Sequence, residues 1–147
     1  MKNRHINHVS VLGSGVMGSG IACLLAGIGV EVLMLDMPPS ELTESEKAKG
    51  LSLNDKSVRN RNAQEHLNKA LKSNPSPIYD KSFASRIEVG NFEDDLEKIK
   101  NSDWIIEVIV ERLDIKNQMF DKVEKFRKPG TLVSSNTSGI PIHLMAA

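Results

Sequence analysis

Runs of apolar residues alternate with helical patterns along most of this chain. Residues 8–12 and 30–35 are mostly apolar, which is typical of strands buried between two layers of helices. The large apolar residues between them have the i, i+3, i+4 and i+7 spacing of one helix face: Ile21, Leu24, Leu25 and Ile28. Because Gly29 is a typical helix end, residues 8–36 predict a strand, a helix and a second strand in succession.

The second half of the chain repeats this alternation. Strands are expected at residues 87–89, 104–110 and 131–134, and helices at residues 92–100, 115–126 (with Asp114 as N-cap) and 142–147. The run at residues 104–110 is rich in β-branched residues, which indicates a central strand covered on both faces. Strands that alternate with helices through right-handed crossovers predict an α/β domain. Its sheet is expected to be parallel and doubly wound, in the order 3-2-1-4-5.

A long insertion, residues 37–86, separates the second predicted strand from the third. Its one convincing helix is predicted at Ser57–Lys72, and a proline-containing stretch ends it. Connections in such folds usually have about 2–6 residues outside their helices. An insertion of this length favours a binding role. A solvated helical decoration is the alternative, because long inserts cost little stability.

The turn after the first strand, Gly13-Ser14-Gly15-Val16-Met17-Gly18, has the G-x-G-x-x-G spacing of a dinucleotide-binding motif. It follows a strand, opens a helix and precedes, by about 20 residues, Asp36 at the end of the next strand. Gly13 permits the tight turn, Gly15 lets a pyrophosphate approach the backbone, and Gly18 lets the helix lie close to the sheet. The free N–H groups at the helix start would bind the phosphates. A glycine-rich turn without a ligand is the alternative.

Asp36 indicates which dinucleotide binds. Its carboxylate can accept hydrogen bonds from both hydroxyls of the adenine ribose, whereas it would repel a 2′-phosphate. No arginine follows it in residues 37–40. The predicted cofactor is therefore NAD, not NADP, and the predicted fold is of the Rossmann type.

Composition narrows the class of protein. The 147 residues suffice for one domain, and 19 basic residues balance 19 acidic ones, so no basic field for nucleic acid is expected. No apolar run reaches the roughly 18 residues of a membrane span, and the first strand begins too early for a targeting peptide. The single cysteine, Cys23, fits a reducing compartment, so a cytoplasmic location is expected. No metal-ligand spacing is found in the sequence.

Candidate reactive groups follow the predicted strands, at the edge where doubly wound sheets bind their ligands. Glu107 lies inside an apolar run, so it either has a buried hydrogen-bonding partner or faces the cleft. Glu111 ends that run and is the better cofactor contact, with an exposed ion pair to Arg112 or Lys116 as the alternative. Lys116, in the first turn of a helix, opposes the helix dipole, which suggests a ligand anion.

The serine and histidine side chains are less specific indicators of a functional site. Ser138 either offers a hydroxyl to a ligand at the end of the last strand or closes a turn. The four histidines, His5, His8, His66 and His143, are expected at the surface or in packing. A proton-transfer base must be held by a partner and aimed at its substrate, and no histidine here has that setting in the sequence.

Three blocks of this sequence closely resemble the NAD-binding domain of the 3-hydroxyacyl-CoA dehydrogenases of fatty-acid β-oxidation. They read VLGSGVMGSGIACLLAGIGVEVLMLD, DWIIEVIVERLDIKNQMF and GTLVSSNTSGIPI, and they cover most of the chain outside the insertion. The E-x-x-x-E strand followed by a lysine and the later S-N-T-S are the most specific elements. The insertion, with RNRNAQ and YDKSFASRIEVGNFEDDL, resembles that of the large multifunctional bacterial members.

The resemblance implies a role for each matching residue. The cofactor-binding residues would be Gly13, Ser14, Gly15, Val16, Met17 and Gly18 at the pyrophosphate, Asp36 at the adenine ribose, and Glu111, Lys116 and Ser138 at the nicotinamide half. Lys116 would also contact the acyl-CoA substrate. Ser138 would be the catalytic residue that hydrogen-bonds the 3-oxygen of the substrate. The family's insertion contacts coenzyme A, but Asn54 stands where a serine is expected, so those contacts are not transferred.

In the family, the catalytic histidine, its orienting glutamate and a helical domain that pairs subunits all follow the S-N-T-S block. Residues 1–147 are therefore expected to be the NAD-binding domain of a longer protein, which acts as a homodimer or in a multifunctional assembly. The leading hypothesis is NAD-dependent oxidation of 3-hydroxyacyl-CoA by that protein, with no turnover by this piece alone. Two alternatives stay open: an NAD(H)-sensing module without catalysis, and a dehydrogenase of a hydroxy acid not linked to CoA.

Overall fold

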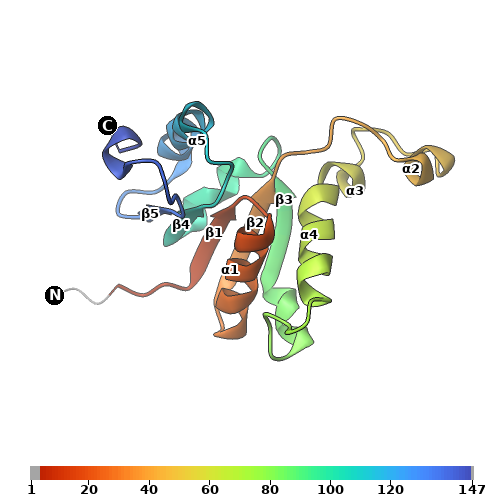
Figure 1. Ribbon diagram of the computed structural model, residues 1–147, viewed down its shortest axis with the longest axis horizontal. Coiled ribbons are helices and arrows are strands. Elements are labelled where there is room, and N and C mark those ends of the chain that lie inside the picture. Colours follow the sequence, from red (N-terminus) through yellow and green to blue (C-terminus); the bar gives the residue numbers. More distant parts are fainter. Residues whose placement is uncertain (1–3, 147) are drawn as a thin grey trace.

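Five strands form a single parallel sheet in the computed structural model, which describes residues 4–146 (Figure 1). The strands are β1 (His8–Leu12), β2 (Glu31–Asp36), β3 (Ile87–Asn91), β4 (Trp104–Glu107) and β5 (Leu132–Ser135). Their order is β3-β2-β1-β4-β5, and every neighbouring pair is parallel. The predicted doubly wound topology is confirmed. All five carboxyl ends therefore meet at one edge of the sheet.

Helices cover both faces of this sheet. The helices are α1 (Val16–Gly27), α2 (Glu44–Ala48), α3 (Lys56–Arg59), α4 (Arg61–Leu71) and α5 (Leu113–Phe126), with 3-10 helices η1 (Lys81–Arg86), η2 (Leu96–Asn101) and η3 (Ile142–Leu144). In Figure 1, α1 and α4 lie side by side on one face, and α5 lies on the other. None of the helices in residues 4–146 is long and apolar enough to cross a membrane.

Successive side chains of the central strands point to opposite faces and so build two cores. Val11 and Met34 belong to the cluster beneath α1 and α4. Their neighbours Leu12 and Leu35 belong to the cluster beneath α5 and η2. All four side chains are fully buried. This double burial explains why the strand sequences read as continuous apolar runs rather than as alternating ones.

The helix α1 contacts the sheet mostly through small side chains, and of its predicted apolar face only Ile21 and Leu25 pack in the core. Its buried residues are Gly18, Ser19, Ala22, Cys23, Leu25 and Ala26. Leu24 and Ile28, which the spacing places on the buried face, are 62% and 72% exposed. Small residues let the helix axis approach the strands closely. Apolar residues lie on several sides of this helix. The side that faces the sheet is the one with small residues, because it can pack most closely against the strands.

Other element boundaries also differ from the prediction. The strand β4 ends at Glu107 instead of residue 110, because the Ile109 N–H turns back to the Glu107 carboxylate at 2.7 Å. Asp114 lies inside α5, whose N-cap is Arg112, and its carboxylate accepts a hydrogen bond from the Arg112 guanidinium. The helices expected at residues 92–100 and 142–147 are the short 3-10 helices η2 and η3, and residue 147 lies outside the described residues.

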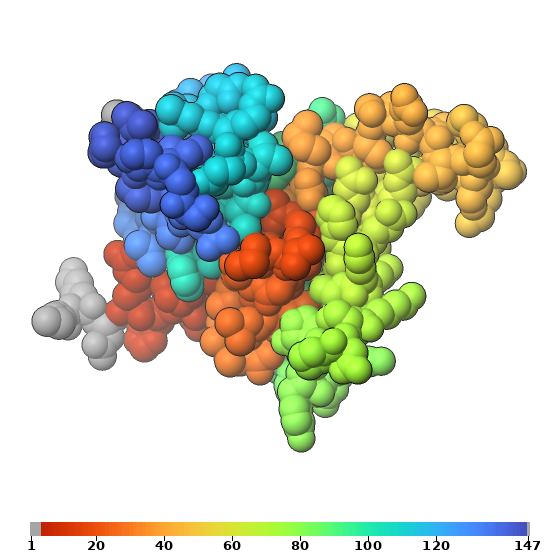
Figure 2. Space-filling view, in the orientation of Figure 1, coloured from red at the N-terminus to blue at the C-terminus, as the bar shows by residue number. Residues whose placement is uncertain are grey.

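The insertion contains more structure than its sequence pattern predicts. The single helix expected at Ser57–Lys72 is divided at Asn60 into α3 and α4. The helix α2, which the pattern does not predict, begins with a capping box between Thr43 and Glu46 and has no buried residue. Figure 2 shows α2, in yellow-orange, projecting from the rest of the molecule. One part of the insertion therefore packs on the sheet, and another extends away from it.

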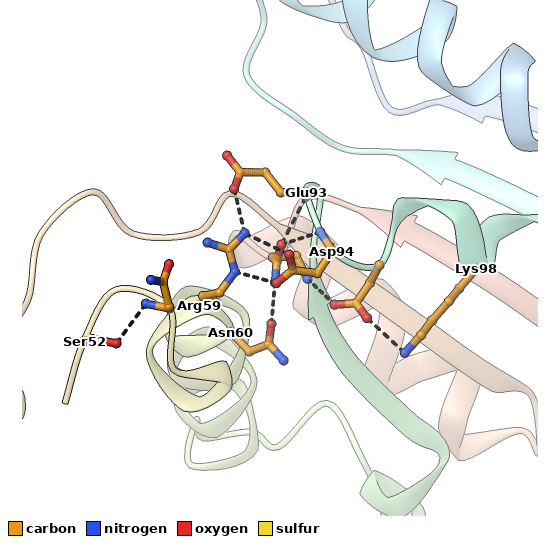
Figure 3. Close-up of polar contacts among 9 residues, drawn as sticks. Ser52, Arg59, Asn60, Glu93, Asp94 and Lys98 are labelled. Carbon is orange, nitrogen blue, oxygen red and sulfur yellow. Dashed lines mark hydrogen bonds and ion pairs between the residues drawn. The ribbon is translucent and has the colours of Figure 1, made fainter.

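A polar network fixes the packed part of the insertion to the end of β3 (Figure 3). Arg59 of α3 donates hydrogen bonds to Asp94 at 2.5 Å and to Glu93 at 2.7 Å. The Asn91 side chain, which is 1% exposed, donates a hydrogen bond to the side-chain oxygen Oδ1 of Asn60 at 2.8 Å. Asn91 also accepts the backbone N–H groups of Glu93 and Asp94. Because these buried amides satisfy each other only in this position, α3 and α4 are held at a defined place.

The glycine before this network provides a test of its packing. A Cβ atom on Gly90 would lie 2.5 Å from the Asp95 carboxylate and 2.9 Å from the Leu35 side chain. Asp95 accepts the Asn91 N–H at 3.0 Å and has little room to move. We expect Gly90→Ala to lower the free energy of unfolding by about 1–3 kcal/mol in urea titrations. Gly20→Ala, where the added Cβ meets nothing within 4 Å, should instead raise the free energy of unfolding by about 0.5–1 kcal/mol. Equal urea midpoints for the two variants would contradict the tight packing around Gly90.

Candidate functional site

The predicted site residues meet at the carboxyl edge of the sheet. Ser14, in the turn after β1, contacts Asp36 at the end of β2. Glu111, after β4, contacts Ser138, after β5. Gly13 lies between these two pairs and packs against the chain that leaves β4. The structure thus brings the glycine turn, Asp36, Glu111 and Ser138 to one continuous region.

The glycines of the turn have the conformations and contacts that the motif requires. Gly13 has a φ of +112°, and a Cβ atom there would lie 2.6 Å from the Val108 carbonyl oxygen. A Cβ atom on Gly18 would lie 1.8 Å from the Gly13 carbonyl oxygen, so α1 starts in contact with the turn. No atom lies within 4 Å of a Cβ built on Gly15. The turn is tightly packed on its inner side and open where a ligand would approach.

The start of α1 is suited to an anion. Its N-cap is Gly15, no side chain of the described residues caps it, and its first turn contains no acidic residue. Val16 and Met17, which open the helix, are 87% and 57% exposed. The N–H groups of the first turn and the positive end of the helix dipole therefore face outward. A diphosphate would supply the acceptors that this helix start lacks.

Asp36 is fixed by the turn beside it. Its Oδ2 accepts hydrogen bonds from the Ser14 N–H at 3.0 Å and from the Ser14 hydroxyl, and its Oδ1 accepts the Met37 N–H at 2.7 Å. Ser14 is fully buried, whereas the Asp36 side chain is 22% exposed. The carboxylate therefore has a fixed orientation and is still partly exposed.

The insertion, residues 37–86, adds one residue to the part of the site around Ser14 and Asp36. His66 of α4 places its Nδ1 2.7 Å from the Ser14 hydroxyl oxygen and 3.6 Å from Asp36 Oδ2. The sequence predicts only a surface or packing role for this histidine. The two residues in the hydrogen bond are 52 positions apart, so no local pattern connects them.

Glu107 and Lys116 form a buried ion pair behind the site. The Lys116 ammonium lies 2.7 and 2.9 Å from the two carboxylate oxygens of Glu107, and the side chains are 1% and 0% exposed. Glu107 also accepts hydrogen bonds from the Ile109 N–H and the Ser135 hydroxyl. Of the two interpretations of Glu107, the buried partner is therefore the one observed. The anion beside Lys116 is therefore the Glu107 carboxylate of the chain itself, whereas the position of Lys116 in the sequence suggests a ligand anion.

Glu111 holds the loop after β5. It accepts hydrogen bonds from the Thr137 hydroxyl at 2.5 Å, the Gly139 N–H at 2.9 Å and the exposed Ser138 N–H at 3.1 Å. Its other oxygen lies 3.4 Å from the Lys116 ammonium, whereas Arg112 pairs with Asp114 instead. The hydrogen bond from Thr137, those from the two N–H groups and the charge of Lys116 lower the pKa of Glu111 to about 2. Thr137 carries no sequence signal for this contact.

Low pH should weaken the interactions by which Glu111 holds the loop after β5. Because the pKa of Glu111 is about 2 in the folded chain and ordinarily 4.5, its contribution to stability is complete above about pH 4.5. The contribution is lost as the pH falls toward 2. We expect Glu111→Gln to be less stable than the parent chain in urea at pH 7, and the difference between the two to shrink below pH 4.5. A difference that stays constant from pH 7 to pH 2 would contradict this assignment.

The fold and the site together define a dinucleotide-binding domain of the kind used by oxidoreductases. Residues 8–147 match the sequence family described as "3-hydroxyacyl-CoA dehydrogenase, NAD binding domain". The chain belongs to this family, and its cofactor is NAD. Arg59 and Arg61, the first arginines after Asp36, are both paired with carboxylates, which fits a cofactor whose ribose carries no 2′-phosphate.

Individual relatives agree with this assignment. The chain is 50% identical over 144 residues to a probable 3-hydroxyacyl-CoA dehydrogenase of Bacillus subtilis, covering 98% of this chain and 18% of the relative. It is 37% identical over 137 residues to a putative fatty acid oxidation complex trifunctional enzyme of Rickettsia felis, covering 93% of this chain and 17% of that one. The chain therefore spans less than a fifth of either relative.

A solved structure shares the fold. The crystal structure of FadB2 from M. tuberculosis superposes with a TM-score of 0.64 at 26% sequence identity. The superposition covers 96% of this chain and 44% of FadB2. The resemblance that the sequence blocks indicate is thus confirmed at the level of family and fold.

Proposed function

We propose that this chain is the cofactor-binding part of an L-3-hydroxyacyl-CoA dehydrogenase that oxidises 3-hydroxyacyl-CoA to 3-oxoacyl-CoA in fatty-acid oxidation. The supporting observation is the connection of Asp36 to the uncapped start of α1 through Ser14. This connection supports the proposal because it holds a carboxylate that could accept hydrogen bonds from a ribose close to a helix start that could bind a diphosphate. Family membership directs the proposal toward 3-hydroxyacyl-CoA as the substrate class.

In this proposal, the glycine turn and the first turn of α1 receive the diphosphate. Asp36 accepts hydrogen bonds from the adenine ribose, in the orientation fixed by Ser14 and Met37. When bound, NAD supplies the hydride acceptor for the reaction. The domain contributes binding and orientation, which is the usual role of the protein in cofactor chemistry.

The residues after β4 and β5 would serve the reacting end of the site. Ser138, on the loop held by Glu111, offers its hydroxyl to the 3-oxygen of the substrate. Lys116 is almost fully buried, so we propose that it acts on cofactor and substrate through its charge, while it fixes Glu107 and Glu111. The resemblance assigns the catalytic histidine to a segment after residue 147.

The proposal also covers the insertion and the complete protein. The projecting helix α2, with no buried residue, gives the insertion an exposed surface for the binding role that its length favours. The complete protein would work in the cytoplasm as a homodimer or in a multifunctional assembly. The multifunctional alternative is supported by the name of the Rickettsia felis relative, a putative fatty acid oxidation complex trifunctional enzyme.

Calorimetric titration and an NADH absorbance assay test this proposal. We expect the 147-residue chain to bind NAD, to bind NADP at least tenfold more weakly, and to oxidise no 3-hydroxyacyl-CoA. The longer protein that contains it should reduce NAD with 3-hydroxyacyl-CoAs and not with the matching free hydroxy acids. NAD binding without turnover by the longer protein would favour a sensing module. Turnover of the free acids alone would favour a dehydrogenase of another substrate class.

A further inference from the structure

The insertion reaches the ribose end of the site through one side chain, His66. Its Nδ1 lies 2.7 Å from the hydroxyl oxygen of Ser14, whose hydroxyl contacts Asp36 Oδ2. The His66 side chain is 46% exposed, the Asp36 side chain is 22% exposed, and Ser14 between them is fully buried. These three residues form a chain of polar contacts from helix α4 to the carboxylate.

The direction of the hydrogen bonds in this chain follows from counting protons. A carboxylate only accepts, so the single hydroxyl proton of Ser14 is donated to Asp36. The Ser14 oxygen must then accept the proton of His66 Nδ1–H. This donor is present both in the neutral tautomer with a proton on Nδ1 and in the imidazolium. His66 therefore donates to Ser14, and Ser14 donates to Asp36.

The helix that carries His66 is itself held in place. Its neighbours Ala63 and Leu67 are 1% and 5% exposed and pack toward the sheet. At its start, the buried contact between Asn60 and Asn91 joins it to the end of β3, next to the Arg59 ion pairs (Figure 3). A donor on such a rigid element fixes its acceptor with little loss of conformational entropy.

We propose that His66 is a positioning residue for the adenine-ribose end of NAD, through Ser14 and Asp36. The inference rests on the proposed binding of NAD at Asp36. Without His66, the Ser14 hydroxyl keeps its acceptor but loses its donor, and the hydroxyl is less polarised and less fixed in rotation. Asp36 then presents a less defined orientation to the ribose. The insertion is thereby part of the cofactor site.

Titrations of NAD and AMP into variants of the 147-residue chain test the proposal. We expect His66→Ala to weaken binding of both ligands about 3- to 10-fold, the range of one hydrogen bond. AMP carries the adenine ribose without the nicotinamide, so an equal factor for both ligands assigns the loss to the ribose end. His66→Asn should restore most of the affinity, because its side-chain N–H can replace Nδ1–H. Gln64→Ala, an exposed change on the same helix, is the matched control and should bind as the parent chain does.

A double variant, His66→Ala with Ser14→Ala, shows whether His66 acts through Ser14 or only stabilises the surrounding structure. If His66 acts through Ser14, adding His66→Ala to Ser14→Ala causes little further loss. Unchanged affinity of His66→Ala overturns the proposal, and so does a loss that His66→Asn fails to restore or that adds fully to Ser14→Ala. A parent chain that is folded by circular dichroism and binds neither ligand overturns the proposed function together with this inference.

Discussion

Replacing Lys116 with methionine is expected to lower the free energy of unfolding by about 3–5 kcal/mol, a large part of the roughly 5–15 kcal/mol of a typical domain. The change removes the contacts at 2.7 and 2.9 Å and leaves the fully buried Glu107 carboxylate without its cation. An unpaired charge in the interior is far more costly than a missing surface charge. Urea unfolding followed by the fluorescence of Trp104, the single tryptophan, measures the loss.

Two further variants make this result specific. Combining Lys116→Met with Glu107→Gln should recover most of the stability, because removing both members of a buried ion pair is often nearly neutral. Arg127→Ala breaks the solvent-accessible pair with Glu124 and should cost less than about 1 kcal/mol. Parent-like stability of Lys116→Met, or a double variant as unstable as the single one, would rule out a buried pair that depends on mutual neutralisation.

Gly18→Ala is expected to weaken NAD binding by about 10- to 100-fold, equivalent to about 1.4–2.7 kcal/mol. The added Cβ would lie 1.8 Å from the Gly13 carbonyl oxygen and 2.8 Å from its carbon. Both are backbone atoms that cannot rotate away, so α1 must move from the turn, and the first N–H groups move with it. Calorimetric titration with NAD measures the change.

Gly20→Ala is the control for this second variant. It lies in the same helix, and its added Cβ meets no atom within 4 Å. We expect it to bind NAD as the parent chain does and to unfold at a slightly higher urea concentration. If Gly18→Ala bound NAD equally well, the contact between the helix start and the turn would have no part in holding the cofactor.

The order of the sheet and the position of the turn could be predicted from the sequence because both are set by short segments. A strand, a tight turn and a helix within residues 8–36 leave few ways to continue a parallel sheet, and later strands extend it by the same right-handed crossover. The glycines carry their own signal, since Gly13 and Gly18 stand where a side chain would collide with the backbone. The location of the site follows from the strand ends.

What the sequence does not predict depends on contacts between distant segments. The large residues of α1 suggest a face with Leu24 and Ile28, but close packing against the strands selects small residues instead. The contact of His66 with Ser14 arises only once the insertion folds back and α4 packs beside α1. The pairing of Lys116 with Glu107 needs the turn after β4, which shortens the strand and brings the helix start over the carboxylate.

The polar network at the end of β3 also determines how this domain can be engineered. Exchanging the insertion for that of another family member would replace Arg59 and Asn60, which meet Glu93, Asp94 and Asn91 across the graft boundary. A chimaera that carried only residues 37–86 would separate these groups from their partners. A transplantable module would have to include β3 and the turn after it. Without those partners, α3 and α4 would lose the contacts that hold them at the end of β3.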